Sequence, residues 1–322
     1  MKILVSPLDW GLGHATRLIP IINWLIDHKH EIIISGSGNS LEILKKTFPN
    51  LKAINLKSFS PWYNSKIGVA ISILIQIPKF LYCIYREQKA TKRIVKKNNI
   101  DLIISDNRYG VRSSLCKSYI ITHQLSPKCG IKYLSTFEPL LACALASFIN
   151  KFNKCLIPDI KPFPDGLSGE LSNPCYIKIP IQYIGILSHL TNNTKQTNDE
   201  TPITWLGIIS GQEPHRTLFE KEITEIFRKK EGRRVIVCGK ITNNNQKSNY
   251  NGIEIYPYLN SNELSKTINL ANNIICRAGY STIMDMYALN KKATFIPTPN
   301  QAEQEYLAKN LKEHPTIQLF SK

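Results

Sequence analysis

Residues 276–311 have the sequence CRAGYSTIMDMYALNKKATFIPTPNQAEQEYLAKNL, in which two turns of small residues follow two apolar runs. The first turn, residues 277–282, opens a helical segment that carries Asp285. Backbone N–H groups in such a turn can approach a phosphate, and the positive end of the helix favours an anion. Asp285 lies about one helical turn further on, where its carboxylate can accept hydrogen bonds from ribose hydroxyls. The stretch predicts either a nucleotide site or an ordinary strand–turn–helix packing unit.

The same order of strand, turn and helix recurs along the chain. Predicted strands cover residues 2–6, 30–35, 101–105, 119–122 and 154–157, then 203–209, 234–238, 252–257, 273–276 and 293–296. Apolar residues at helical spacing separate many of them, which is typical of parallel sheets with helices on both faces. Residues 186–202 are polar and without periodicity. We therefore predict an α/β protein with two Rossmann-like doubly wound domains, 1–185 and 203–322, joined by a linker.

Composition limits the possible partners. The 322 residues are 43% hydrophobic and 20% charged, as in globular proteins, and the formal net charge is +17. This charge permits nucleic acid, an anionic membrane surface or an anionic small molecule. We expect no nucleic acid, because no aromatic platform or recognised motif accompanies the charge. The eight cysteines form no CxxC pair, so we expect reduced thiols, no metal site and a cytoplasmic protein.

Residues 67–85, IGVAISILIQIPKFLYCIY, form the most apolar segment. Gln76, Pro78 and Lys79 interrupt the segment, which argues against a membrane span. A buried helix pair and a segment lying at a membrane surface both stay open. The second alternative rests on seven basic residues around or after the segment, which can meet anionic headgroups: Lys79, Arg86, Lys89, Lys92, Arg93, Lys96 and Lys97.

Polar residues that follow the predicted strands are the candidate site residues, because the carboxyl ends of the strands in both halves should face one cleft. The turn 11–17, GLGHATR, is not GxGxxG, and no acidic residue ends the second strand, which disfavours NAD. His14 follows the glycine turn and can act as a base or simply pack on its own helix.

Four further residues and one turn are also candidate site residues. Asp106, Asn107 and Arg108 end one strand and His123 ends the next, while Ser210-Gly211 ends the first strand of the second half. Asp106 can orient or deprotonate a hydroxyl, or cap a helix, and the turn at Ser210 offers N–H donors to an anion.

Two motifs resemble those of GT-B glycosyltransferases of family 28. Residues 11–14 with Pro20 resemble the amino-terminal glycine-rich loop of that family, GGH followed by a proline. Residues 276–279, continued through Pro297 to Gln304, resemble its carboxy-terminal nucleotide-sugar signature. Asp285 stands where the family has a ribose-binding Glu, and residues 210–213 replace a more glycine-rich loop.

The resemblance implies an inverting transfer of a hexose or N-acetylhexosamine from a UDP-sugar to an acceptor hydroxyl, without metal or cofactor. It implies His14 as the base, with Asp106 as second choice, and Arg17, Asn107, Arg108 and His123 as acceptor-binding residues. The implied donor-binding residues are Gly13, Ser210, Gly211, Arg277, Gly279, Ser281, Thr282, Asp285, Asn300, Gln301 and Gln304. The apolar and basic segment then fits a lipid-linked acceptor at the inner face of the cytoplasmic membrane.

Two alternatives stay open from the sequence. Residues 13–17, GHATR, also resemble the glycine-His-x-x-Arg turn of UDP-sugar hydrolases of the pseudaminic acid pathway, in which water replaces the acceptor. The second alternative is a protein that binds a nucleotide sugar without catalysis.

Overall fold

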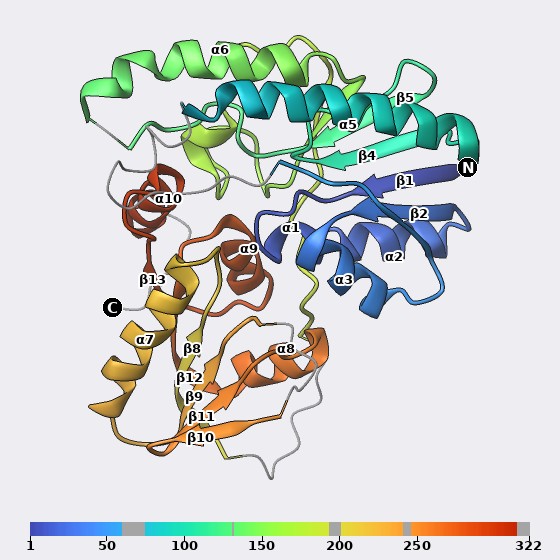
Figure 1. Cartoon of the computed structure of the whole chain (residues 1–322). Helices are drawn as coiled ribbons and strands as arrows, with labels where there is room; N and C mark the ends of the chain where they lie inside the picture. Colours follow the sequence, from blue (N-terminus) through green and yellow to red (C-terminus); the bar gives the residue numbers. More distant parts are fainter. Residues whose placement is uncertain (60–74, 131, 193–200, 241–245, 314–322) are drawn as a thin grey trace.

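A computed structural model describes residues 1–59, 75–130, 132–192, 201–240 and 246–313 of the chain. These residues form two halves, each built around its own sheet (Figure 1). Short helices and turns from both halves meet between the two sheets, at the level of α1 and α9 in Figure 1.

The amino-terminal sheet has seven strands in the order β3-β2-β1-β4-β5-β6-β7, and every neighbouring pair is parallel. Its strands are β1 (Lys2–Ser6), β2 (Glu31–Gly36), β3 (Lys52–Asn55), β4 (Leu102–Asp106), β5 (Lys117–Ile121), β6 (Lys154–Ile157) and β7 (Ile181–Tyr183). Its helices are α1 (Gly13–Thr16), α2 (Ile19–Asp27), α3 (Gly38–Thr47), α5 (Ile77–Asn98), η1 (Lys132–Phe137), α6 (Glu138–Ile149) and η2 (Gly169–Ser172).

Alternation along these strands divides the side chains between two buried faces. In β1, Ile3 and Val5 pack with α2, whereas Leu4 packs in a separate cluster with Val95 of α5. Cys155 of β6 packs in a third cluster with Ile149, the last residue of α6. The sheet is thus covered on both faces, which explains why its strands are almost wholly apolar.

The carboxy-terminal sheet has six strands in the order β10-β11-β9-β8-β12-β13, and only the β10–β11 pair is antiparallel. Its strands are β8 (Ile203–Ile208), β9 (Arg234–Val237), β10 (Ser248–Tyr250), β11 (Ile253–Tyr256), β12 (Ala271–Arg277) and β13 (Thr294–Ile296). Its helices are α7 (His215–Arg228), α8 (Ser261–Asn269), α9 (Tyr280–Ala288) and α10 (Ala302–Glu313).

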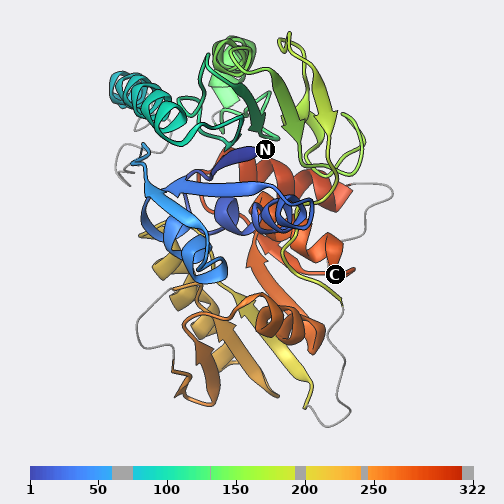
Figure 2. The same cartoon turned by 90° about the vertical axis from the view of Figure 1, so that its right-hand side faces the viewer.

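The two halves share one continuous hydrophobic cluster. It includes Ala15 from α1, Leu187 from the segment after β7, and Ala278 and Tyr280 at the start of α9. The views in Figures 1 and 2 agree that α9 and α10 lie against the amino-terminal half. The carboxyl end of β12 is therefore held close to the carboxyl ends of β1 and β4.

The expected α/β class with two doubly wound sheets is confirmed. Three short strands, β3, β7 and β10, were not expected, and the first helix is divided into α1 and α2. α8 begins at Ser261, because Asn260 and Glu263 form a reciprocal capping box there.

Pro78 does not interrupt a helix, because it lies in the first turn of α5, where its missing N–H costs no hydrogen bond. Residues 67–74 of the apolar segment and residues 193–200 of the expected linker lie outside the described residues. Within the described ranges, no helix combines the length and the apolar character that crossing a bilayer requires.

Candidate active site

The glycine turn after β1 brings a histidine to the end of a neighbouring strand. Gly11 has a φ of +95°, which favours glycine, and α1 begins two residues later. His14 Nδ1 lies 3.3 Å from both carboxylate oxygens of Asp106, the last residue of β4. The His14 side chain stays 17% exposed, whereas Asp106 is fully buried. Because β1 and β4 are paired in the sheet, residues 92 positions apart form one cluster.

Both carboxylate oxygens of Asp106 already accept hydrogen bonds from neighbouring side chains. Arg17 Nε donates to Asp106 Oδ2 at 2.7 Å, and Arg17 Nη2 donates to Oδ1. Burial acts to raise the pKa of Asp106, but the charges and hydrogen bonds of Arg17 and His14 lower it to about 2. An ionised carboxylate can only accept hydrogen bonds, so it favours the His14 tautomer that carries its proton on Nδ1. In that tautomer, His14 Nε2 is left as the basic nitrogen.

The start of α9 touches this turn from the other half. Ser281 Oγ donates to the carbonyl oxygen of Gly13 at 3.2 Å. A Cβ on Gly13 would lie 2.8 Å from Ser281 Oγ, so only glycine permits this approach. A Cβ on Gly279 would have Thr282 Oγ1 as its nearest neighbour, at 3.9 Å, which leaves space beside the amino end of α9. The first N–H groups of a helix have no intrahelical acceptor and can bind an anion in such a space.

Asp285 lies on the same helix and is bound by the segment that joins the halves. Ser188 Oγ donates to Asp285 Oδ1 at 2.6 Å, and His189 Nδ1 lies 3.7 Å from the same oxygen. Burial raises the pKa of Asp285 to about 7, against the opposing effect of the Ser188 hydrogen bond. Burial also lowers the pKa of His189 to about 4. Asp285, whose side chain is 14% exposed, therefore has few donors for a largely enclosed carboxylate.

The side chain of Arg277 packs against neighbouring residues in this structure. Its guanidinium carbon is 3.8 Å from the centre of the Phe219 ring, and Nη1 donates to Pro297 O at 2.8 Å. Arg277 thereby holds the end of β13 against α7. Its side chain is buried, so it does not extend toward the amino end of α9 as a free cation.

Residues 298–305 form a turn held by its own side chains. Gln304 Oε1 accepts a hydrogen bond from Thr298 N at 2.8 Å, and Glu305 Oε1 accepts one from Asn300 N at 3.0 Å. Asn300 adopts a φ of +61°, and the Gln301 N–H donates to Thr298 O. Gln304 thus orders the turn that follows β13.

The turn at Ser210 and Gly211 follows β8. Gly211 has a φ of +110°, and a Cβ placed on it would meet no atom within 4 Å. The turn is therefore open, and its glycine is required by backbone conformation and not by crowding.

Arg108 and Asn107 follow Asp106 but point into different surroundings. Arg108 is fully buried, donates to Glu87 Oε1 at 2.9 Å and to Ser6 Oγ at 3.0 Å, and so ties α5 to β1. Asn107 has a φ of +54°, and its buried Oδ1 has no hydrogen-bond partner among the described residues. Arg108 therefore serves packing in this structure, whereas Asn107 retains an unused acceptor.

His123 is held by residues that the sequence did not single out. His123 Nε2 lies 2.9 Å from Glu303 Oε1, and its ring stacks on Tyr280 with centroids 3.9 Å apart. Tyr280 also donates from its hydroxyl to Pro158 O at 2.7 Å. Glu303 is one of two acidic residues in the first turn of α10, and Tyr280 is one of 14 tyrosines, so no local pattern marks either residue.

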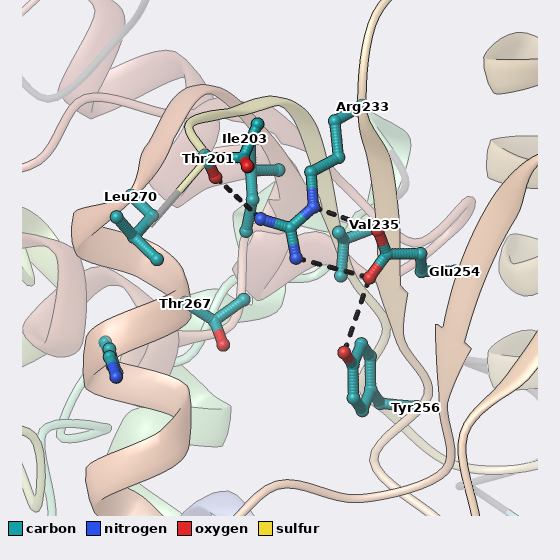
Figure 3. A pocket seen from close by; sticks show the side chains of 9 residues that line it. Thr201, Ile203, Arg233, Val235, Glu254, Tyr256, Thr267 and Leu270 are labelled. Carbon is teal, nitrogen blue, oxygen red and sulfur yellow. Dashed lines mark hydrogen bonds and ion pairs between the residues drawn. The ribbon is translucent and has the colours of Figure 1, made fainter. Parts of the chain in front are cut away.

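A cavity of about 410 Å³ lies elsewhere in the carboxy-terminal half (Figure 3). It is at the amino ends of β8 and β9, whereas the turn before α9 follows the carboxyl end of β12, which is parallel to β8. Figure 3 shows Arg233 beside Glu254, to which its Nε donates at 2.9 Å. Hydrogen bonds from Arg233, more than any other influence, lower the pKa of Glu254 to about 2. This ion pair braces β11 and is separate from the cluster at His14.

Comparison with known proteins agrees with this geometry. Residues 211–316 match the glycosyltransferase family 28 C-terminal domain. A UDP-N-acetylglucosamine–N-acetylmuramyl-(pentapeptide) pyrophosphoryl-undecaprenol N-acetylglucosamine transferase of Clostridium perfringens is 25% identical over 305 residues, covering 91% of this chain and 77% of that enzyme.

Solved structures share the fold. The glycotransferase of kitacinnamycin has a TM-score of 0.62 at 12% identity, over 100% of this chain and 85% of that one. MurG of Acinetobacter baumannii has a TM-score of 0.50 at 13% identity, over 97% of this chain and 83% of that one. The two facing sheets and these likenesses define a GT-B glycosyltransferase that uses a nucleotide sugar. Within this class, the match of residues 211–316 and the likeness to the Clostridium perfringens enzyme support the family 28 type.

Proposed function

We propose that the protein transfers a hexose or N-acetylhexosamine, with inversion, from a UDP-sugar to a hydroxyl of a lipid-linked acceptor. The observation that carries the proposal is the contact between the two glycine turns, in which Ser281 Oγ meets Gly13 O one residue before His14. A base from one half and a phosphate-binding helix end from the other are thereby adjacent. The first donor and acceptor to test are those named for the Clostridium perfringens relative, UDP-N-acetylglucosamine and the N-acetylmuramyl pyrophosphoryl-undecaprenol lipid.

In the proposed reaction, His14 Nε2 removes the proton from the acceptor hydroxyl as its oxygen attacks the anomeric carbon. The bond from that carbon to the UDP oxygen breaks, and UDP leaves with the electron pair. Asp106 holds the His14 ring and stabilises the imidazolium that forms. This role suits Asp106 better than that of the base, because its carboxylate is buried and already accepts hydrogen bonds from Arg17.

The leaving diphosphate is proposed to bind at the amino end of α9. N–H groups of residues 279–282 and the positive end of the helix can stabilise its developing charge without reorganisation. Asp285 is proposed to accept hydrogen bonds from the ribose, and the turn with Asn300, Gln301 and Gln304 to contact the donor sugar. We expect that added EDTA leaves the rate unchanged, because these donors supply the stabilisation themselves.

Turnover of the whole chain tests the proposal. We expect UDP release from UDP-N-acetylglucosamine to depend on the lipid acceptor and to fall by about 10²–10⁴-fold in His14→Ala, the usual contribution of a general base. His28→Ala is the matched control, because His28 is exposed on the same half and its side chain contacts only Trp24 among the interactions of the described residues. UDP release at full rate in water alone would favour the hydrolase, and turnover unaffected by His14→Ala would contradict the mechanism.

An anionic membrane surface is the proposed site of action. Apolar side chains of α5 and α6 are exposed, among them Tyr85 at 61% and Leu140 at 68%, and the rings of Phe80 and Phe148 link the two helices. Arg86 and other basic residues of α5 are exposed beside them. Each basic residue near an anionic surface contributes about 1 kcal/mol.

Vesicle binding tests this surface separately from catalysis. We expect the protein to sediment with vesicles that contain phosphatidylserine and to be released by salt. Arg86→Ala/Leu140→Ser should bind more weakly, whereas Lys229→Ala, a change at an exposed cation beyond α7, should bind like the wild type. Equal binding to neutral and anionic vesicles would contradict the electrostatic part of the proposal.

A further inference from the structure

One side chain of the carboxy-terminal half binds two residues at the carboxyl end of β5. Glu303, in the first turn of α10, accepts from His123 Nε2 through Oε1 at 2.9 Å, and Gln124 Nε2 donates to its other oxygen. The His123 ring stacks on Tyr280 at an interplanar angle of 17°. Stacking on Tyr280 of α9 thus fixes the plane of the imidazole ring, and the hydrogen bond to Glu303 of α10 fixes the rotation of the ring within that plane. The ring itself belongs to the amino-terminal half.

The charge state of this pair determines the tautomer of His123. The side chain of His123 is 3% exposed and that of Glu303 is 23% exposed. Burial lowers the pKa of His123, although Glu303 opposes the shift, so the ring is neutral at pH 7. Burial acts to raise the pKa of Glu303, but the hydrogen bond from His123 lowers it, so the carboxylate is ionised. A neutral ring facing a carboxylate carries its proton on Nε2, and Nδ1 then bears a free lone pair.

Two unused acceptors lie at the ends of neighbouring strands. His123 Nδ1 is buried and has no hydrogen-bond partner in the described parts of the chain, and the same holds for Asn107 Oδ1. Asn107 follows β4 and His123 follows β5, and the Asn107 N–H donates to Ile121 O between them. Buried acceptors without partners are rare in folded proteins. The carboxyl ends of strands in open α/β sheets are also where ligands bind.

We infer that Glu303 is a positioning residue: it fixes His123 with the proton on Nε2, so that Nδ1, together with Asn107 Oδ1, accepts hydrogen bonds from a saccharide acceptor. This inference rests on the proposed function for the identity of the acceptor. The chemistry of the two acceptor atoms indicates the class of ligand. His123 Nδ1 and Asn107 Oδ1 both require a hydrogen-bond donor, and a saccharide carries several hydroxyl and amide N–H donors. Since Glu303 belongs to the carboxy-terminal half, the contact between the two halves prepares the acceptor site.

The groups around His123 come from three elements. Glu303 faces it from α10 and Tyr280 from α9, while the charge of Arg17, and that of His14 when it is protonated, act on it from the turn after β1. The positive charges act against protonation of the ring, which keeps Nδ1 as an acceptor.

The test compares Glu303→Ala, which removes both acceptor oxygens, with Glu303→Gln, which retains one. Glu313→Gln, a change at an exposed residue of the same helix, is the matched control. Nitrogen-15 NMR of the histidine ring reads the tautomer of His123 without turnover. We expect a proton on Nε2 in the wild type and in Glu313→Gln, a mixture of tautomers in Glu303→Ala, and an intermediate or wild-type state in Glu303→Gln.

Steady-state transfer from UDP-N-acetylglucosamine to the N-acetylmuramyl pyrophosphoryl-undecaprenol lipid supplies the second measurement. Loss of one neutral hydrogen bond predicts a KM for the acceptor about 3–10-fold higher in Glu303→Ala, a smaller change in the KM for the donor, and partial rescue in Glu303→Gln. A purely structural role would change the melting temperature but neither the tautomer nor the acceptor KM selectively.

Failure of the inference about Glu303 and failure of the proposed function would give different results. A wild-type His123 with its proton on Nδ1, or a Glu303→Ala variant with an unchanged tautomer, would overturn the inference even if transfer occurs. Absence of transfer by the wild type with every lipid acceptor would contradict the proposed function, while the NMR result would still decide whether Glu303 fixes the ring.

Discussion

Asp106, which is fully buried, and Asp285, whose side chain is 14% exposed, are carboxylates on opposite sides of the contact between the halves, and their surroundings differ. Asp106 receives two hydrogen bonds from Arg17, and His14 Nδ1 contacts both of its oxygens; these neighbours lower its pKa to about 2. Asp285 receives a hydrogen bond from Ser188 and lies near a neutral His189, and burial raises its pKa to about 7. A carboxylate whose oxygens already accept hydrogen bonds from the protein can orient a neighbouring side chain. A carboxylate that is short of donors can bind a ligand that brings hydroxyl groups.

The largest effect should follow from removing the charge of Asp106. Asp106→Asn leaves Arg17 buried without its anion, which predicts a loss of about 3–5 kcal/mol in the free energy of unfolding. Asp27→Asn, at an exposed aspartate of α2, should change it by less than about 0.5 kcal/mol. Urea denaturation measures both. A loss for Asp106→Asn as small as that of the control would show that the ion pair is not what stabilises this cluster.

The pH dependence of stability should differ between the two carboxylates. The folded pKa of Asp106 lies below its unfolded value of 3.8, so its stabilisation is present above pH 3.8 and is lost as the pH falls through about 2. The folded pKa of Asp285 lies above 3.8, so its contribution is fully present below pH 3.8 and is lost as the pH rises through about 7.

Asp285→Asn cannot titrate, so without ligand its free energy of unfolding should exceed that of the wild type increasingly from pH 4 to pH 8. The difference should amount to a few kcal/mol, at most about 4 kcal/mol, since each unit of pKa corresponds to about 1.4 kcal/mol. His189, with a pKa of about 4, titrates in both proteins. Parallel stability curves across this range would contradict the raised pKa of Asp285.

A smaller effect is expected on donor binding. Asp285→Ala should raise the KM for the UDP-sugar by about 10–100-fold, because hydrogen bonds to a charged group contribute about 1.5–3 kcal/mol. Asp285→Glu should retain more of the affinity than Asp285→Ala, since it keeps the carboxylate. An unchanged donor KM in Asp285→Ala would remove Asp285 from the proposed ribose site.

The smallest effect should come from Ser188→Ala. The variant removes one hydrogen bond to Asp285 and should lower the free energy of unfolding by about 1 kcal/mol at pH 8, where the carboxylate is charged. It should also raise the pKa of Asp285 further, because the Ser188 hydroxyl stabilises the charged form. An identical pH profile of stability in Ser188→Ala and in the wild type would show that this hydrogen bond does not control Asp285.

Local patterns predicted much of the fold because most strands are continuous apolar runs that end in polar or glycine turns. The short strands β3 and β10 escaped prediction, since their residues are largely exposed or only partly buried. The cluster of His14 and Asp106 needed the strand order, because periodicity does not reveal that β1 and β4 are neighbours. Arg108 and Arg277 look like ligand-binding cations in sequence, but their guanidinium groups are occupied by Glu87 and by the end of β13.

The hydrophobic cluster shared by the two halves has a consequence for how such enzymes can diversify. Ala15 and Leu187 pack in the same cluster as Ala278 and Tyr280, so the carboxy-terminal half is packed against its own amino-terminal half. A chimera that takes its carboxy-terminal half from a relative would inherit mismatched contacts around Gly13 and Ser281. Recombination of halves should therefore succeed mainly when the first turn of α9 is exchanged together with the glycine turn that it meets.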